Sequence, residues 1–283
     1  RSDEWFLGEI FGSGTSKEDK EKRRKFLSQM MDSATNGDRN AKNYIVNRVK
    51  TFLMQRCGLN FETAKYVVDF DNINALCPRT KFEMLCCRYD LCEILENNRE
   101  IDTYFTAAIL DDIVTREVKQ SRLLFDEGER IELISRMIYA DLYGYSVIDS
   151  LEFMNINEVE VLDANSIWVV HRSRKINLDF LCFKSEDELE MVQKKAVKYS
   201  SERDLSPANP YIICDRYDGS RVTVTMTKLN TRRTLNLRKF NLENISLQEL
   251  RGKHASIDHF TEKAIRIATR GRANIAICGG MSD

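Results

Sequence analysis

The sequence pattern changes near residue 155, and this change constrains the fold more than any other feature. Before it, apolar residues such as Ile45, Val49 and Phe52 recur at three- and four-residue steps, which is typical of amphipathic helices. After it, short runs rich in β-branched and aromatic residues alternate with turn residues, which predicts a meander of strands. We therefore predict an α+β fold, in which a helical bundle precedes an antiparallel sheet.

The helical half should hold several short helices joined by short polar breaks. The first begins near residue 41 and ends at Gly58, a plausible C-cap. Further helices are predicted over residues 62–68, 81–97, 101–124 and 129–143. The mixed charges favour solvated faces, with a partner-docking bundle as the alternative. Residues 1–40 begin with an apolar stretch, which is either a docking peptide or a poorly ordered arm.

The second half should contain strands near residues 159–161, 167–170, 176–183, 211–215, 221–228 and 234–240. Asp218-Gly219 is a strong hairpin turn between two of them. Ser185 and Glu188 form a capping box that should open a helix over residues 186–199. Two later helices are expected to start at Ser246 and Ser256, and the second should run to Gly271.

A glycine pair follows the last apolar run. Residues 274–278 are predicted to form a buried strand, and the next five residues fit the first five positions of G-x-x-x-x-G-K-[ST], a phosphate-binding loop. These five are Gly279, Gly280, Met281, Ser282 and Asp283. Strand–Gly–Gly turns are common, so the motif depends on its context. Without a parallel sheet to join, the strand should be unstable or pack on the N-terminal domain or another chain.

Composition excludes several classes of function. The net charge of −1 gives no global attraction to nucleic acid, so no direct nucleic-acid partner is expected. No apolar stretch approaches the roughly 20 residues of a membrane span, and the start does not resemble a signal peptide. We expect a soluble, cytoplasmic protein that reaches a membrane only through a partner.

Metal and nucleophile motifs are weak. Cys77, Cys86, Cys87 and Cys92 invite a metal interpretation, but they lack C-x-x-C spacing and a nearby histidine. Reduced thiols in a reducing compartment are favoured, so no metal site is predicted in this chain. The three histidines are dispersed, and no G-x-S-x-G or H-E-x-x-H occurs, so no catalytic residue is predicted within the chain.

Six phrases in a fixed order carry a family resemblance over about residues 130–283. They are LYGYSVIDSL (142–151), NEVEV (157–161), SIWVV (166–170), RYDGSRV (216–222), LRKF (237–240) and RANIAICGG (272–280). In this order and spacing they resemble the ATPases of type II and type IV secretion, pilus assembly and conjugation. The tight-adherence pilus branch is the most similar. No single phrase is specific, and the order carries the resemblance.

The resemblance implies a domain organisation. Residues 1–40 would be an arm, 41–130 the helical bundle, and 131–270 a PAS-like antiparallel-sheet domain. Residues 271–283 would begin a RecA-like nucleotide-binding domain whose remainder is missing. It also implies a ring, expected to be a hexamer, that binds ATP and Mg²⁺ and docks to a platform protein at the cytoplasmic face of the inner membrane.

The resemblance further assigns nucleotide-binding residues. The family holds arginines of its N-terminal domain over the nucleotide, and the matching positions here are Arg238, then Arg221, with Arg216 as a weaker candidate. Guanidinium groups suit phosphate oxygens because they donate in a fixed fork. The glycine-rich residues would add backbone N–H groups.

The phosphate loop departs from the family pattern. Met281 replaces a small polar residue, Ser282 replaces a glycine, and Asp283 adds a negative charge beside the expected phosphates. The loop lysine, the Mg²⁺-binding hydroxyl and the downstream acids are not in the sequence, so this fragment alone should be inactive. The alternative is a non-enzymatic scaffold or partner-docking module derived from such an ATPase.

Overall fold

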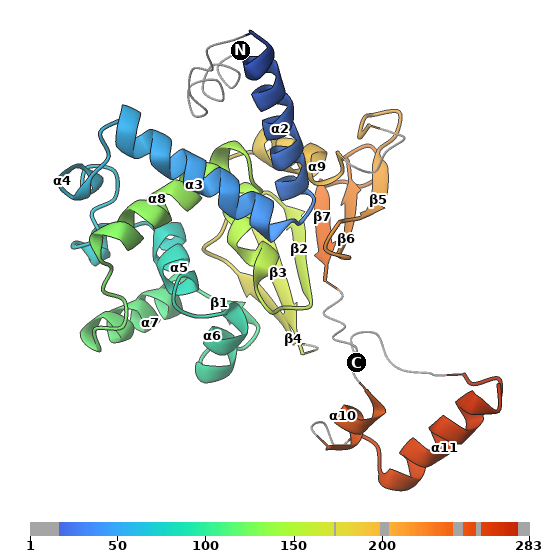
Figure 1. The fold of residues 1–283 in the computed structure, drawn as a ribbon. Coiled ribbons are helices and arrows are strands. Elements are labelled where there is room, and N and C mark those ends of the chain that lie inside the picture. Colours follow the sequence, from blue (N-terminus) through green and yellow to red (C-terminus); the bar gives the residue numbers. More distant parts are fainter. Residues whose placement is uncertain (1–16, 173, 199–203, 240–245, 253–255, 277–283) are drawn as a thin grey trace. The chain divides into compact units, whose positions relative to one another are not determined.

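The computed structural model describes residues 17–172, 174–198, 204–239, 246–252 and 256–276. The chain forms two compact units, Arg1–Lys239 and Phe240–Asp283. The larger unit packs helices against a seven-stranded, mostly antiparallel sheet (Figure 1). The α+β class, with helices leading into the sheet, is therefore confirmed. The four-part division of the chain stays a prediction.

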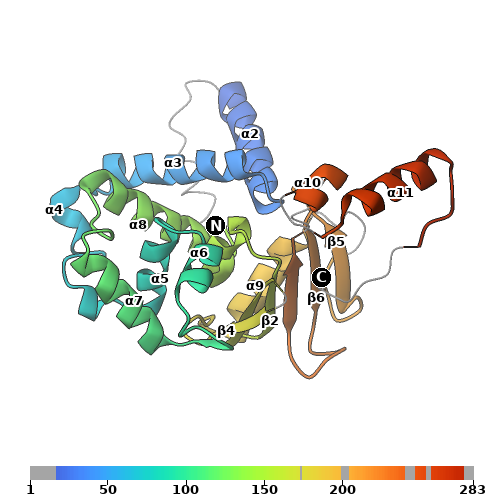
Figure 2. The ribbon, with the colours of Figure 1, turned by 90° about the horizontal axis from the view of Figure 1, so that it is seen from below.

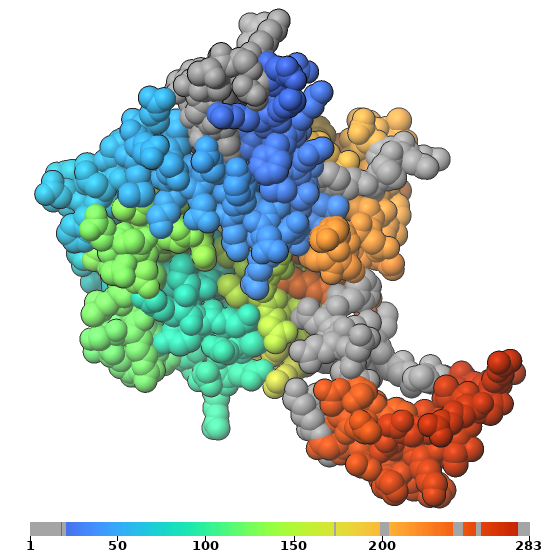
Figure 3. Space-filling model, in the orientation of Figure 1, coloured from blue at the N-terminus to red at the C-terminus, as the bar shows by residue number. Residues whose placement is uncertain are grey.

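Two long helices begin the described chain. Helix α2 (Lys17–Thr35) lies within the predicted arm and packs against α3 (Arg39–Arg56). Asp38 caps α3 by accepting hydrogen bonds from the backbone of Asn40 and Ala41, and Gly58 follows its end at φ +68°. In the space-filling view both helices form one continuous surface (Figure 3). Beneath α3, a small apolar core joins it to α8 (Glu127–Leu142).

The middle helices are shorter than predicted. They are α4 (Phe61–Ala64), η1 (Ile73–Ala75), α5 (Pro78–Cys86), α6 (Leu91–Asn97) and α7 (Ala107–Lys119). The helix predicted over residues 81–97 is two helices, because Asp90 caps the second by accepting from the Cys92 N–H. The helix predicted over 101–124 starts only at Ala107, since strand β1 (Tyr104–Phe105) pairs parallel with β4 (Arg174–Leu178).

The sheet has the order β1-β4-β3-β2-β7-β6-β5. Its other strands are β2 (Glu158–Asp163), β3 (Ser166–His171), β5 (Tyr211–Asp215), β6 (Arg221–Thr225) and β7 (Thr234–Arg238). The predicted meander and the Asp218–Gly219 hairpin turn are confirmed, with Gly219 at φ +79°. Side chains alternate: Val222, Val224, Leu235 and Leu237 are buried on one face, and their neighbours on the other face are half-buried or exposed.

One face of the sheet therefore carries the core. Buried side chains of η2 (Ser146–Phe153), of α5 to α8 and of α9 (Glu186–Ala196) belong to the same apolar cluster as the buried strand residues. A second view shows α3 running beside α8 (Figure 2). Because the helices share one core with the sheet, side chains from both halves of the sequence can meet at its border.

The smaller unit contains α10 (Leu247–Gly252) and α11 (His259–Arg270). Asp258, not Ser256, caps α11. The strand predicted over 274–278 is wrong for residues 274–276, which are irregular and exposed, with Ile275 half exposed. A strand needs a neighbour to satisfy its backbone groups, and no strand of this unit is described. Within the described residues, no helix is both long and apolar enough to cross a membrane.

Candidate functional site

Arg221 and Arg238 occupy opposed positions on neighbouring strands. Arg221 of β6 pairs in register with Arg238 of β7, although the two are 17 positions apart in sequence. Directly opposed residues project from the same face of a sheet. Their neighbours Val222 and Leu237 are buried, so both arginines lie on the open face. We call these two residues the arginine pair.

Acidic residues flank the arginine pair. In register, Asp215 of β5 lies opposite Arg221, and Glu158 of β2 lies opposite Arg238. The Arg221 Nε donates to Asp215 at 2.7 Å, and this hydrogen bond lowers the pKa of Asp215. Like charges directly opposed on a sheet repel each other, and flanking carboxylates reduce this cost. The four opposed positions Asp215, Arg221, Arg238 and Glu158 can therefore hold two guanidinium groups side by side at the surface.

Arg216 lies elsewhere. It follows β5, is 5% exposed, and donates to the carboxylate of Glu152 in η2. A phosphate contact for Arg216 stays a prediction, but its guanidinium is engaged by a buried carboxylate. The structure thus brings two of the three predicted arginines together and separates the third, which sequence spacing could not distinguish.

Arg216 belongs to a buried group of charges that sequence reasoning missed. We call Lys42, Asp149, Glu152, Arg216 and Lys239 the charge cluster. Lys42 Nζ lies 2.7 Å from Asp149 Oδ2 and 3.0 Å from Glu152 Oε2. Burial acts to raise the pKa of Glu152, but the charges and hydrogen bonds of Lys42 and Arg216 together lower it. The cluster joins α3, η2 and the residues that directly follow β5 and β7.

Close backbone approaches build this cluster. A Cβ on Gly144 would lie 2.1 Å from Asp149 Oδ1, the atom that accepts from the Tyr145 N–H at 2.9 Å. Gly144 is therefore the sequence signal that could have pointed to the site. At the hairpin, the Tyr217 N–H donates to the Asn36 carbonyl at 2.9 Å, and Gly37 at φ +92° packs against Asp218. The turn between α2 and α3 thereby contacts the hairpin that begins β6.

Lys239 closes the cluster beside the arginine pair. It is 9% exposed, and its Nζ donates to the carbonyls of Leu151 and, at 2.8 Å, Met154. Its own N–H donates to the Asn157 carbonyl at 2.8 Å. Burial lowers the pKa of Lys239 to about 7. These bonds hold the residue that immediately follows Arg238.

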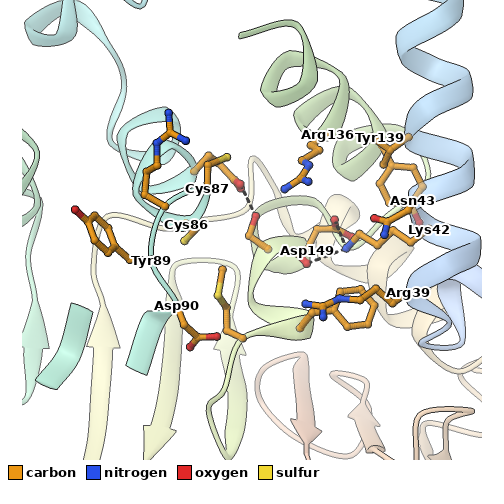
Figure 4. Close-up of a pocket in the computed structure, with 16 residues that line it drawn as sticks. Arg39, Lys42, Asn43, Cys86, Cys87, Tyr89, Asp90, Arg136, Tyr139 and Asp149 are labelled. Carbon is orange, nitrogen blue, oxygen red and sulfur yellow. Dashed lines mark hydrogen bonds and ion pairs between the residues drawn. The ribbon is translucent and has the colours of Figure 1, made fainter. Parts of the chain in front are cut away.

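A pocket of about 520 Å³ lies between α3, α5, α8 and η2 (Figure 4). We call it the helical pocket. It is lined by charged, aromatic and thiol side chains, including Arg39, Glu83, Cys87 and Arg136. Burial raises the pKa of the Cys87 thiol to about 11, which makes it a poor nucleophile at neutral pH. No local sequence pattern pointed to this pocket, because its walls come from four separated segments.

The described residues contain no group of three or more His, Cys, Asp and Glu side chains that could hold a metal ion. The predicted phosphate loop, Gly279, Gly280, Met281, Ser282 and Asp283, lies outside the described residues. Of the predicted nucleotide-binding residues, the structure therefore describes only the three arginines.

Comparisons with known proteins give little detail. No protein-family model matches the chain, and no curated protein matches it. Among solved structures, the chain is similar to the VirB11 ATPase of the Brucella suis type IV secretion system in complex with sulphate, at 14% identity and a TM-score of 0.31. The match covers 43% of this chain and 40% of the VirB11 chain.

Proposed function

We propose that this chain is the N-terminal part of a secretion or pilus-assembly ATPase, and that the arginine pair contacts the nucleotide phosphates. The observation that carries the proposal is the register of Arg221 opposite Arg238. Two family phrases, RYDGSRV and LRKF, supply these residues, and the fold brings them to one surface. The order of the six phrases, two of which contain these arginines, gives further support.

The arginine pair has the chemistry that this role needs. Phosphoryl transfer depends on positioning and on stabilising charge on phosphate oxygens. Two guanidinium groups at opposed strand positions can donate several N–H bonds to one phosphate chain. Arg221 would exchange its bond to Asp215 for the phosphates, so Asp215 would tune the affinity. ATP, with its Mg²⁺, is the proposed cofactor, and Gly279 to Asp283 would supply backbone N–H groups.

The wider setting belongs to the same proposal. We infer a ring of identical subunits, with a hexamer as the expected form, in which ATP turnover moves domains and drives pilus assembly, secretion or conjugative transfer. The protein would lie in the cytoplasm and reach the inner membrane through a platform protein. Turnover would require the loop lysine and hydroxyl, which these 283 residues do not contain.

The test uses the protein made from its complete gene. Arg238→Ala and Arg221→Ala should each lower kcat/KM for ATP roughly 10- to 100-fold, because each removes charge-assisted donors to the phosphates. Arg238→Lys should also lose activity, since an ammonium cannot form the same fork. The control is Arg232→Ala, an exposed arginine that pairs with Asp163 at 2.6 Å.

Three outcomes are informative. Loss of turnover in the arginine-pair variants with normal Arg232→Ala kinetics supports the proposal. Variants of Arg221 and Arg238 that behave like Arg232→Ala would remove the pair from the nucleotide site. A wild-type protein that assembles but neither binds nor hydrolyses ATP would favour the scaffold alternative.

A further inference from the structure

The helical pocket contains a buried acceptor atom without a hydrogen-bond partner. Glu83 lines the pocket and is 6% exposed. Its Oε2 accepts from the Ser150 hydroxyl, but its Oε1 has no partner among the described residues. A buried carboxylate oxygen left unpaired costs free energy, so such an atom in a native pocket calls for an explanation.

Most other charges of the pocket are neutralised locally. Lys42 pairs with Asp149, and Arg88 forms a two-bond pair with Glu129 at 2.6 and 2.8 Å. Asp90 accepts from the backbone N–H groups of Cys92 and Asn155. These residues shape the walls but have few bonding groups left for a ligand.

Two arginines retain donors. Arg39 lies over the Phe153 ring at 5.0 Å, and no carboxylate pairs with it within the described residues. Arg136 uses its Nε for Glu132 at 3.2 Å, and its two terminal nitrogens make no hydrogen bond to the described residues. Figure 4 shows both side chains reaching into the pocket, one from the start of α3 and the other from α8.

We propose that the helical pocket binds a phosphate group, as inorganic phosphate or as a small phosphomonoester, through Arg39, Arg136 and Glu83. The two guanidinium groups would donate to the phosphate oxygens, which suit their fork geometry. Inorganic phosphate keeps a proton at pH 7, a phosphomonoester with its second pKa of about 6 keeps one in a minority of molecules, and sulfate keeps none. This O–H can donate to Glu83 Oε1. The ligand thus gives a hydrogen-bond partner to the buried acceptor that lines this pocket.

The pocket has room for a phosphomonoester as well as for the bare ion. A volume of about 520 Å³ lies in the range of roughly 300–1,000 Å³ typical of sites for small organic ligands. The aromatic rings of Tyr89 and Phe153 also line the pocket and offer apolar surface to an organic group. The site differs from the arginine pair in residues and in elements, so it stands or falls separately from the proposed ATPase function.

The first experiment compares two isosteric anions. The whole 283-residue chain is titrated by calorimetry at pH 7, in low salt and a buffer free of phosphate, with phosphate, sulfate and glycerol phosphate. We expect one phosphate to bind per chain. Sulfate should bind at least roughly tenfold more weakly than phosphate, because sulfate offers no proton to Glu83. Tighter binding of glycerol phosphate would identify the ester as the ligand, and tighter binding of phosphate would identify the free ion.

Variants locate the site. Arg136→Ala and Arg39→Ala should each weaken phosphate binding roughly tenfold or more, and Glu83→Gln should abolish the preference over sulfate. Arg122→Ala, at an exposed arginine in the turn that follows α7, is the matched control and should bind normally. The double variant Arg221→Ala, Arg238→Ala should keep this binding, which separates the pocket from the arginine pair.

The proposal is overturned by any of three results. These are no phosphate binding, equal binding of phosphate and sulfate by the wild-type chain, or loss of binding in the arginine-pair variant with retention in Arg136→Ala. The anion comparison uses the wild-type chain only, so it remains decisive even if Glu83→Gln does not fold.

Discussion

Lys239 offers a direct test of how the fold holds the end of β7. Its ammonium group is buried, and burial lowers its pKa from the usual 10.5 to about 7, although the carboxylate of Glu152 acts in the opposite direction. In the folded chain the proton leaves near pH 7, whereas in the unfolded chain it stays until about pH 10.5. Folding therefore releases a proton between these values, and stability must rise with pH across this window.

The size of the effect follows from the two pKa values. For a single group that titrates at about 7 when folded and 10.5 when unfolded, the free energy of unfolding rises by about 1.5 kcal/mol from pH 7 to pH 8.5. Buried thiols such as Cys87, whose pKa is raised to about 11, act in the opposite direction above pH 8. A comparison with Lys239→Met cancels their contribution, because both proteins carry the same thiols.

The assay is urea unfolding of the whole chain at pH 7, 7.5, 8 and 8.5. Between the ends of this range the wild type should gain about 1.5 kcal/mol relative to Lys239→Met, and Lys228→Met, at an exposed lysine, should keep the wild-type slope. Parallel pH profiles for the wild type and Lys239→Met would refute the reasoning. They would mean that Lys239 stays protonated in the folded chain, held by Glu152 and by the two carbonyls.

Three further predictions concern the same unit. Glu152→Gln should lower the free energy of unfolding, measured in urea, by roughly 3–5 kcal/mol, because it leaves Lys42 and Arg216 buried without their shared carboxylate. A decrease below about 1 kcal/mol would contradict this. Gly37→Ala should lower the free energy of unfolding by roughly 2–4 kcal/mol, because φ is +92° and a Cβ would lie 2.6 Å from the Asp218 side chain. Gly58→Ala, where a Cβ would meet open space, should lower it by about 1 kcal/mol. Equal Tm shifts for the two variants would exclude the clash with Asp218. At pH 8, Cys87 should react with a disulfide reagent roughly 100-fold more slowly than the exposed Cys182, because its thiolate is scarce. The rates are read by mass spectrometry, and similar rates would show that the pKa of Cys87 is not raised.

Local signals predicted most of the sheet. Strand β5 was predicted with its observed bounds, and β6 and β7 with their observed starts, because alternation and the Asp218–Gly219 turn act within a few residues. The capping signal at Ser185 likewise predicted the start of helix α9. Such signals need no knowledge of distant residues. Local signals fail where a distant part of the chain decides the secondary structure. Tyr104 and Phe105 form a strand because they pair with β4, and residues 274–276 form no strand.

The candidate sites show the same limit more sharply. The family phrases pointed to Arg221 and Arg238, but only the register of β6 and β7 brings them together. The helical pocket was not predictable, since Arg39, Glu83 and Arg136 come from three helices whose packing no local pattern encodes. Gly144 was visible in the sequence, but its reason, the close approach of Asp149, was not.

The two arginines of the hairpin phrase show how burial decides the role of a residue. Arg216 and Arg221 are five positions apart in one motif, yet the side chain of Arg216 is 1% exposed and that of Arg221 is 49% exposed. A guanidinium as buried as Arg216 requires a permanent carboxylate, and Glu152 supplies it. A guanidinium as exposed as Arg221 pairs only weakly with Asp215, so it can exchange that partner for a phosphate at small cost. The buried arginine therefore fixes the hairpin to η2, and the exposed one is the arginine of this phrase that we propose for phosphate binding.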